Sequence, residues 1–317
     1  MQFGFNMAFD DLYQRDGLIK LDAAFVDDLK AVDMALHNRF VAARADRTAL
    51  SDKEHSQLLL DLAPHAEDFI GRLFGIEKEL RALAEKHHAL APLYACKRLF
   101  VQRRAAKALP AEQVENISGD ALLGLLLLVP ADDPYFELVF AKVVMGWLEK
   151  EEEHKSLLEI AARYAAWALF STAGRKRHAQ GLLFKQPKKL DPFHLIAVDT
   201  EERDGVQVMR LPEGHLRSRD GFKLTDDGGT LAQALDSAHY CIFCHNQGKD
   251  SCSKGMKVAG VRNQVSDQKE SSATYKKNAL DIMLNGCPLE EKISEMNLLK
   301  SEGVPLGALA MVVVDPN

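Results

Sequence analysis

The sequence has few cysteines and lacks a long apolar run. Five cysteines among 317 residues are too few for a scaffold built on disulfides. The longest largely apolar stretches, residues 121–130 and 161–170, fall short of the roughly 20 residues that a helix needs to cross a bilayer. Residues 1–16 carry acidic side chains and lack the basic and apolar regions of an export signal. We therefore expect a cytoplasmic protein without a membrane span.

A surplus of positive charge is also missing. The chain has 40 Lys and Arg residues against 46 Asp and Glu residues, which gives a formal net charge of −6. Binding to nucleic acids or to anionic membrane surfaces depends on clustered positive charge. The charge balance therefore argues against a nucleic-acid partner. Hydrophobic residues make up 47% of the chain, which is enough for a large core and for more than one domain.

Helical periodicity dominates the first half of the chain and predicts a helical N-terminal domain over residues 1–184. Ser51 and Glu54 are spaced as a capping box, in which each side chain satisfies a backbone donor of the other residue at a helix start. Pro64 is expected to begin the following helix. Apolar residues recur at spacings of three and four, as on one helix face: Phe25, Leu29, Val32 and Leu36.

The pattern changes near residue 185 to short β-rich segments and turns, which predicts a small β-containing connector over residues 185–229. Within it, residues 193–198 and 206–211 are separated by a turn and predict a hairpin. Helical patterns return in a cysteine-rich module over residues 230–317. The helices are expected at residues 230–237, 271–284 and 290–301. The predicted fold class is therefore mainly α, with a helical domain, a small β-containing connector and a helical metal-binding module.

Four of the five cysteines lie within 47 residues of sequence and form the strongest candidate site: Cys241, Cys244, Cys252 and Cys287. The first two are spaced as C-x-x-C, so both thiolates can face one metal, and two more thiolates complete a four-sulfur shell. Such a shell suits an iron–sulfur cluster or a structural zinc ion. Pro288 directly after Cys287 is typical of several iron–sulfur motifs and favours the cluster. Cys96 stands apart in a helical context and is expected to be a buried, inert side chain.

A c-type haem is a specific alternative to the iron–sulfur cluster, because residues 241–245 also match the haem-attachment pattern C-x-x-C-H. Met256 would then be a candidate distal ligand. This reading leaves Cys252 and Cys287 without a role, and it lacks the export signal that normally accompanies haem attachment. Zinc remains a further alternative, in which the cysteines only stabilise a protein-interaction module.

Other polar clusters carry weaker patterns. Two Glu-x-x-His steps resemble those of di-iron bundles, but such a short pattern recurs by chance. They are Glu85 with His88, and Glu151 with His154. His87 and His88 are adjacent and are expected to point in different directions. His178 follows three basic residues and is expected to lie in a surface patch at a helix end.

The cysteine segment resembles the N-terminal iron–sulfur region of the glutamate synthase small subunit. The same region occurs in dihydropyrimidine dehydrogenase and related FAD-dependent pyridine-nucleotide oxidoreductases. The resemblance covers approximately residues 235–310, and residues 287–303 match best. Here the cysteines are spaced more widely than in that family, with residues 253–286 inserted between the last two. The matching positions are Cys241, Cys244, Cys252, Cys287 and Pro288.

The resemblance implies a cluster of the 4Fe–4S type held by these four cysteines. In that family NAD(P)H reduces FAD, and single electrons then pass through iron–sulfur clusters to a partner. A glycine-rich G-x-G-x-x-G fingerprint for a dinucleotide is missing from this sequence. The resemblance therefore implies flavin- and nucleotide-binding domains downstream or on another chain, and a protein electron-transfer partner. The expected function is electron transfer within an oxidoreductase, without catalytic residues on this chain.

Overall fold

The computed structural model describes residues 2–314 except 110, 127, 187–195, 216–217, 226–227, 243–250, 257, 259–274, 279 and 290. The chain divides into two compact units. The first comprises Met1–Lys185, Leu231–Gly255 and Gly286–Asn317, and the second comprises Gln186–Thr230 and Met256–Asn285. The boundaries expected from the sequence remain predictions, since the two units are defined by packing in space and not by order along the chain.

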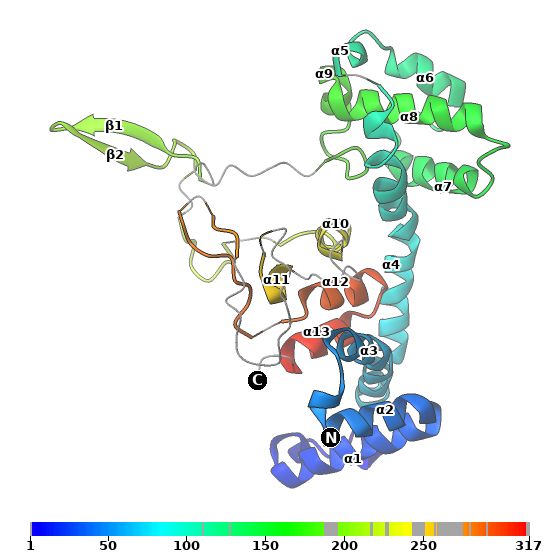
Figure 1. Cartoon of the computed structure of the whole chain (residues 1–317), viewed down its shortest axis with the longest axis vertical. Helices are drawn as coiled ribbons and strands as arrows, with labels where there is room; N and C mark the ends of the chain where they lie inside the picture. The colour runs from blue at the N-terminus through cyan, green and yellow to red at the C-terminus, as the bar shows by residue number, and fades with distance from the viewer. Residues whose placement is uncertain are drawn as a thin grey trace. The chain divides into compact units, whose positions relative to one another are not determined.

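The predicted fold class, mainly α, is confirmed (Figure 1). The helices of the first unit follow one another along the chain as α1 (Arg15–Val32), α2 (Met34–Ala45), α3 (Asp52–Phe74), α4 (Glu77–Cys96), α5 (Ala111–Val114), α6 (Gly119–Leu126), α7 (Phe136–Glu149), α8 (Lys155–Phe170), α9 (Thr172–Arg177), α10 (Leu231–Cys241), α11 (Ser251–Lys254), α12 (Ile293–Ser301) and α13 (Pro305–Val314). A π-helical turn over Lys97–Val101 follows α4 directly. None of the described helices is long and apolar enough to span a membrane.

The start of α3 shows how local sequence fixes a helix boundary. The Ser51 hydroxyl accepts from the Glu54 amide, and the Glu54 carboxylate accepts from the Ser51 amide, so the predicted capping box is present. Gly75 ends the helix in the left-handed region at φ 69°. Pro64 lies inside α3, so the prediction that it begins a new helix is wrong. Buried side chains on both sides of Pro64, including Leu60 and Phe69, hold the helix together through this position.

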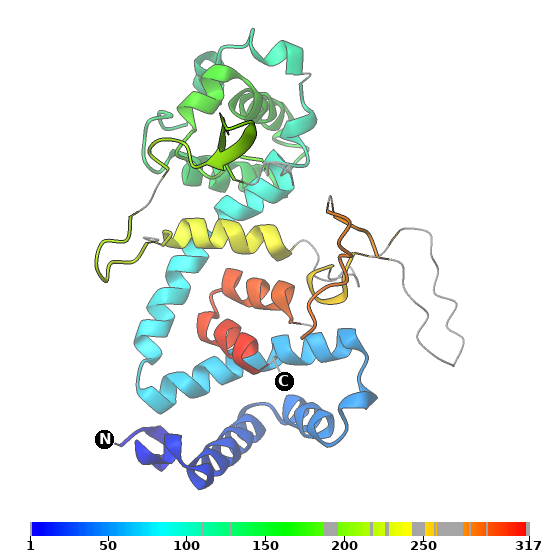
Figure 2. The ribbon, with the colours of Figure 1, turned by 90° about the vertical axis from the view of Figure 1, so that its left-hand side faces the viewer.

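The largest core surrounds α8, whose alanines let neighbouring helices approach closely. Of the helix residues, Ala161, Ala165 and Ala168 are fully buried. Around α8 pack α6, α7 and α9. A second cluster joins Leu60 and Ala63 of α3 to Leu299 of α12 and to α13. Packing runs from α3 through α13 and α12 to α10, and α4 contacts both α3 and α10 (Figure 2).

The second unit contains an antiparallel hairpin of β1 (Asp199–Arg203) and β2 (Val206–Arg210). Asp199 pairs with Arg210, and Asp204 and Gly205 form the turn with φ of 53° and 78°. The hairpin was expected with a first strand at residues 193–198; of these, 193–195 lie outside the described residues, 196–198 are not in a strand, and β1 begins at Asp199. The Asp-Gly pair allows a two-residue turn, and the register of the short turn sets the strand.

The helix expected at residues 271–284 is also wrong in its described part. Lys277 and Met283 form an isolated antiparallel bridge, and Asp281 between them adopts φ 62°. By contrast, the helices expected around residues 230–237 and 290–301 are present as α10 and α12.

Candidate cysteine site

Cys241 is the last residue of α10 and is exposed. The buried face of α10, with Leu235 and Ala238 each 1% exposed, fixes the helix in the first unit. Two polar contacts tie the helix to the end of α4. The Tyr94 hydroxyl donates to the Ala232 carbonyl at 2.5 Å, and Lys97 pairs with Asp236 at 2.5 Å. Cys241 therefore stands at the end of a firmly anchored helix.

His239 lies on the buried side of the same helix. Its ring stacks on Tyr94 with 4.5 Å between the ring centroids and 16° between the planes. Burial lowers the pKa of His239 to about 4, and the nearby charge of Arg98 acts in the same direction. The imidazole is therefore neutral at physiological pH, and its Nδ1 has no hydrogen-bond partner among the described residues.

Cys252 and Cys287 are 35 positions apart in sequence but neighbours in space. The Cys287 amide donates to the Cys252 carbonyl at 2.8 Å. Cys252 lies in the short helix α11 and is exposed, whereas Cys287 is partly buried. Next to them, the Ser253 hydroxyl donates to the Glu291 carbonyl at 2.5 Å, so α11 is held against the segment that leads into α12.

Gly286 makes this close approach possible. It adopts φ 88°, in the left-handed region, and a Cβ added there would lie 2.5 Å from the Gly255 amide nitrogen and 2.6 Å from the Ser253 carbonyl oxygen. Gly255 also has a positive φ, of 78°. A side chain at position 286 would force the two segments apart.

The chain that connects Cys252 to Cys287 begins and ends at neighbouring backbone positions. In the second unit the Met256 amide donates to the Leu284 carbonyl at 2.8 Å, and the Lys276 amide donates to the Met256 carbonyl at 2.7 Å. In the first unit the corresponding backbone bond joins Cys287 to Cys252 at 2.8 Å. The long sequence interval between the two cysteines therefore does not separate them in the fold.

The other members of the predicted cluster are placed less fully. Cys244 and His245 lie outside the described residues. Among the residues that the structure does describe, no group of three or more His, Cys, Asp or Glu side chains is arranged to hold a metal ion. The structure thus brings Cys252 and Cys287 together and places Cys241 in the same unit. Met256, the distal ligand of the haem alternative, belongs to the second unit.

Cys96 is fully buried, as expected from its helical context. Burial raises the pKa of its thiol to about 12, so it remains protonated and unreactive. The Glu-x-x-His pairs are engaged elsewhere. Glu151 pairs with Arg104 at 2.7 Å, and His88 donates to the Glu302 carbonyl at 2.9 Å.

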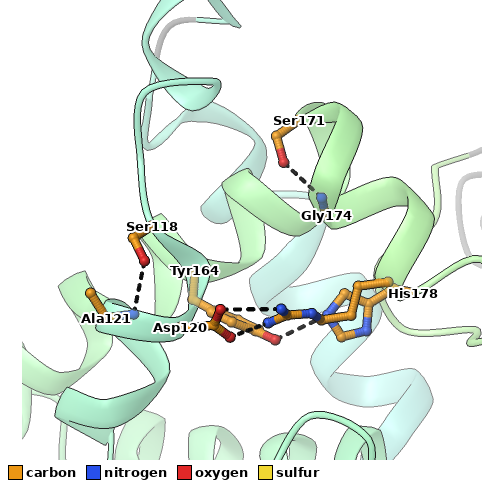
Figure 3. Close-up of polar contacts among 8 residues, drawn as sticks. Ser118, Asp120, Ala121, Tyr164, Ser171, Gly174 and His178 are labelled. Atoms are coloured by element: carbon orange, nitrogen blue, oxygen red, sulfur yellow. Dashed lines mark hydrogen bonds and ion pairs between the residues drawn. The ribbon is translucent and has the colours of Figure 1, made fainter.

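A buried hydrogen bond next to α8, flanked by an exposed ion pair, was not predicted (Figure 3). The Tyr164 hydroxyl and His178 Nε2 are hydrogen-bonded at 3.0 Å, and Arg177 contacts both carboxylate oxygens of Asp120 at 2.5 and 3.3 Å. The expectation that His178 lies on the surface is wrong, because its side chain is only 6% exposed. The nearby aromatic residues Trp167 and Phe184 were the available sequence signal for this burial.

Comparison with known proteins places the chain among proteins that share a helical N-terminal domain. Residues 3–75 match the family described as RP005 N-terminal alpha-helical domain. The uncharacterized protein RP005 of Rickettsia prowazekii (strain Madrid E) is 35% identical over 311 residues, which cover 95% of this chain and 99% of that relative. The chain therefore belongs to the RP005 family. No solved structure matches it.

Proposed function

We propose that this chain holds an iron–sulfur cluster of the 4Fe–4S type on Cys241, Cys244, Cys252 and Cys287. Through this cluster it transfers electrons as part of a flavin-dependent NAD(P)H oxidoreductase of the cytoplasm. FAD and the nicotinamide nucleotide would be bound by other domains, and a protein partner would exchange electrons with the site. When bound, the cluster supplies a carrier of single electrons.

The observation that carries the proposal is the hydrogen bond between the Cys287 amide and the Cys252 carbonyl, at 2.8 Å. It supports the proposal because the long interval 253–286, the main departure from the glutamate synthase pattern, does not keep Cys252 and Cys287 apart. The Cys252 and Cys287 thiols, although distant in sequence, can therefore bind the same cluster. The donor set of four cysteines is the set that iron–sulfur clusters commonly use.

The local backbone also fits such a group. Gly255 and Gly286 leave the sulfur-bearing segments without Cβ atoms where they approach each other. Backbone amides at turns of this kind can hydrogen-bond to sulfur and stabilise its negative charge. Helix α10, anchored by the bond from Tyr94 to the Ala232 carbonyl, fixes the backbone of Cys241, the first proposed ligand.

The test is the metal content of the full chain purified without oxygen. About four iron and four acid-labile sulfide per chain, with a broad brown absorption that bleaches on reduction by dithionite, are expected for the proposed cluster. Zinc without sulfide in a colourless sample would refute the proposal and leave a structural metal site. Haem that stays attached to the denatured chain would refute it in favour of a cytochrome.

Single substitutions assign the ligands. Cys241→Ser, Cys244→Ser, Cys252→Ser and Cys287→Ser should each lower iron and sulfide content, since each removes a thiolate. Cys96→Ala is the matched control, because Cys96 is buried in the core and should leave the iron content unchanged. Full iron and sulfide content in Cys287→Ser would remove that residue from the ligand set.

A further inference from the structure

Cys252 and Cys287 have a second chemistry that needs no metal. A residue's Cα lies about 1.5 Å from its own amide nitrogen and about 2.4 Å from its own carbonyl oxygen, so a bond of 2.8 Å between amide and carbonyl keeps the two Cα atoms within about 6.7 Å of each other. That upper limit lies within the range of about 4.4 to 6.8 Å that a disulfide bridges. The bond between the Cys287 amide and the Cys252 carbonyl is 2.8 Å long, so this pair meets the distance requirement. We propose that Cys252 and Cys287 form a reversible thiol–disulfide pair, which a low-molecular-weight disulfide oxidises when the site holds no metal.

The surroundings favour this reaction at these two cysteines. Cys252 is exposed and Cys287 is partly exposed, so a small disulfide can reach them. The Ser253 hydroxyl fixes α11 to the Glu291 carbonyl, and Lys254 pairs with Asp52 of α3 at 3.3 Å. Because both backbones are held in place by the fold, closure of the disulfide is an intramolecular step that needs little further loss of chain entropy.

The exchange proceeds in two balanced steps with glutathione disulfide as the oxidant. The Cys252 thiol loses its proton to solvent, and the thiolate attacks one sulfur of glutathione disulfide. The protein–glutathione bond forms as the glutathione disulfide bond breaks, and one glutathione thiolate leaves. The Cys287 thiolate then attacks the Cys252 sulfur and releases the second glutathione. Two protein thiols are oxidised to one disulfide, and one glutathione disulfide is reduced to two thiols.

The disulfide would regulate the site, a consequence that rests on the proposed function. Oxidation removes two of the four proposed cluster ligands at once, so the oxidised chain cannot load a cluster. A thiol reductant restores both ligands. The disulfide also keeps either thiol from further oxidation to sulfinic acid, which is irreversible for most proteins. The pair would therefore protect the empty site from irreversible oxidation. It would also allow a cluster to be inserted only when cellular thiols are reduced enough to open the disulfide.

The test uses the full chain, reduced and stripped of metal with a chelator, then incubated with glutathione disulfide. Remaining thiols are alkylated in denaturant, and peptides are mapped by mass spectrometry without reduction. A peptide that links Cys252 to Cys287, with loss of two alkylatable thiols and recovery of both on reduction, is the expected result. Cys252→Ser and Cys287→Ser should each abolish the linked peptide. Cys96→Ala should retain it, since Cys96 is buried and not part of the pair.

The proposal is overturned if both cysteines remain fully alkylatable, or if either is linked to Cys241, Cys244 or a second chain instead of to its neighbour. Iron and sulfide are measured on a separate, untreated anaerobic sample. A chain that lacks iron but forms the Cys252–Cys287 bond refutes the cluster and keeps the disulfide. A chain with a cluster whose metal-free form does not make this bond refutes the disulfide and keeps the cluster.

Discussion

Protonation of His178 should lower the stability of the first unit in mild acid. Its side chain is 6% exposed, and its ring lies against that of Phe184 with 4.6 Å between centroids. Tyr164 is its hydrogen-bond partner (Figure 3). Burial lowers the pKa of His178 to about 4, and the charge of Arg177 adds to the effect. A proton on this ring would leave a positive charge buried among aromatic side chains.

The size of the effect follows from the two pKa values. In the unfolded chain the imidazole titrates near pH 6.5, whereas in the folded protein it titrates near 4. Between these values the unfolded state binds the proton and the folded state does not. The contribution of His178 to stability is therefore complete above pH 6.5 and is lost as the pH falls toward 4. From pH 7.5 to pH 5 the loss is about 2 kcal/mol of the free energy of unfolding.

The assay is urea denaturation of wild type and His178→Gln at these two pH values, followed by tryptophan fluorescence. Trp167 reports on the site directly, because its ring centroid is 6.4 Å from that of His178. The glutamine variant should lose about 2 kcal/mol less than wild type between pH 7.5 and pH 5, because its side chain does not titrate there. Tyr164→Phe is the control: it removes the hydrogen bond but leaves His178 buried, so the pH dependence should persist. Equal acid sensitivity in wild type and His178→Gln would refute the reasoning.

Substitutions at Gly286, Glu67 and Leu299 test the packing of the glycine turn beside Cys287 and of helices α12 and α13. Gly286→Ala should cost about 1–3 kcal/mol of stability and lower the iron content, because φ is 88° there and the added Cβ would lie 2.5 Å from the Gly255 nitrogen. Full iron content in this variant would contradict the prediction. Glu67→Ala should cost about 1–3 kcal/mol in urea denaturation, since its carboxylate accepts two amides at the start of α13, whereas Glu67→Gln should recover part of the loss. Leu299→Ala, at a site 1% exposed, should lower the free energy of unfolding by about 2–5 kcal/mol. Its control, Leu309→Ala at a site 58% exposed, should change that free energy by no more than about 0.5 kcal/mol. Equal losses of stability in the two variants would show that α12 is not packed as described.

Local chemistry predicted those parts of the fold that depend on neighbouring residues. The capping box at Ser51 and the Asp204-Gly205 turn are determined by contacts within a few positions. Pro64 shows where this reasoning stops. A helix start was predicted at Pro64 because proline lacks the amide hydrogen that a helix interior uses. In the structure, the packing of α3 residues before and after Pro64 outweighs the loss of that one hydrogen bond. The burial of His178 likewise depends on aromatic residues from α7, from α8 and from the segment after α9, which a local pattern does not bring together.

For the candidate site, the sequence predicted the residue types but not their arrangement. The spacing of Cys241, Cys244, Cys252 and Cys287 pointed to a metal. It did not predict that Gly255 and Gly286 meet, because 30 residues separate them in sequence. The bond from the Met256 amide to the Leu284 carbonyl likewise joins residues far apart in sequence.

The long helix α4 gives the helical half of the chain a role at the proposed site. Near its end, Tyr94 holds α10, which carries Cys241. One to two turns earlier, His87 and His88 donate to the Lys300 and Glu302 carbonyls at the end of α12, at 3.0 and 2.9 Å. These bonds add donors to carbonyls at the C-terminal end of a helix, where regular intrahelical partners run out. The two adjacent histidines thus bond to different carbonyls at the same helix end.

The consequence is that one helix sets the positions of two cysteine-bearing segments that are distant in sequence. α12 follows Cys287 closely, and the Ser56 hydroxyl of α3 donates to Glu295 of α12 at 2.6 Å, which adds a second anchor from the N-terminal helices. The spacing between Cys241 and Cys287 therefore depends on α3 and α4 as much as on the cysteine segment itself. If the four cysteines hold a cluster, damage to these distant contacts should loosen it without touching a ligand. His87→Ala with His88→Ala should accordingly speed the loss of iron to a chelator, while exposed positions on α1 should have no such effect.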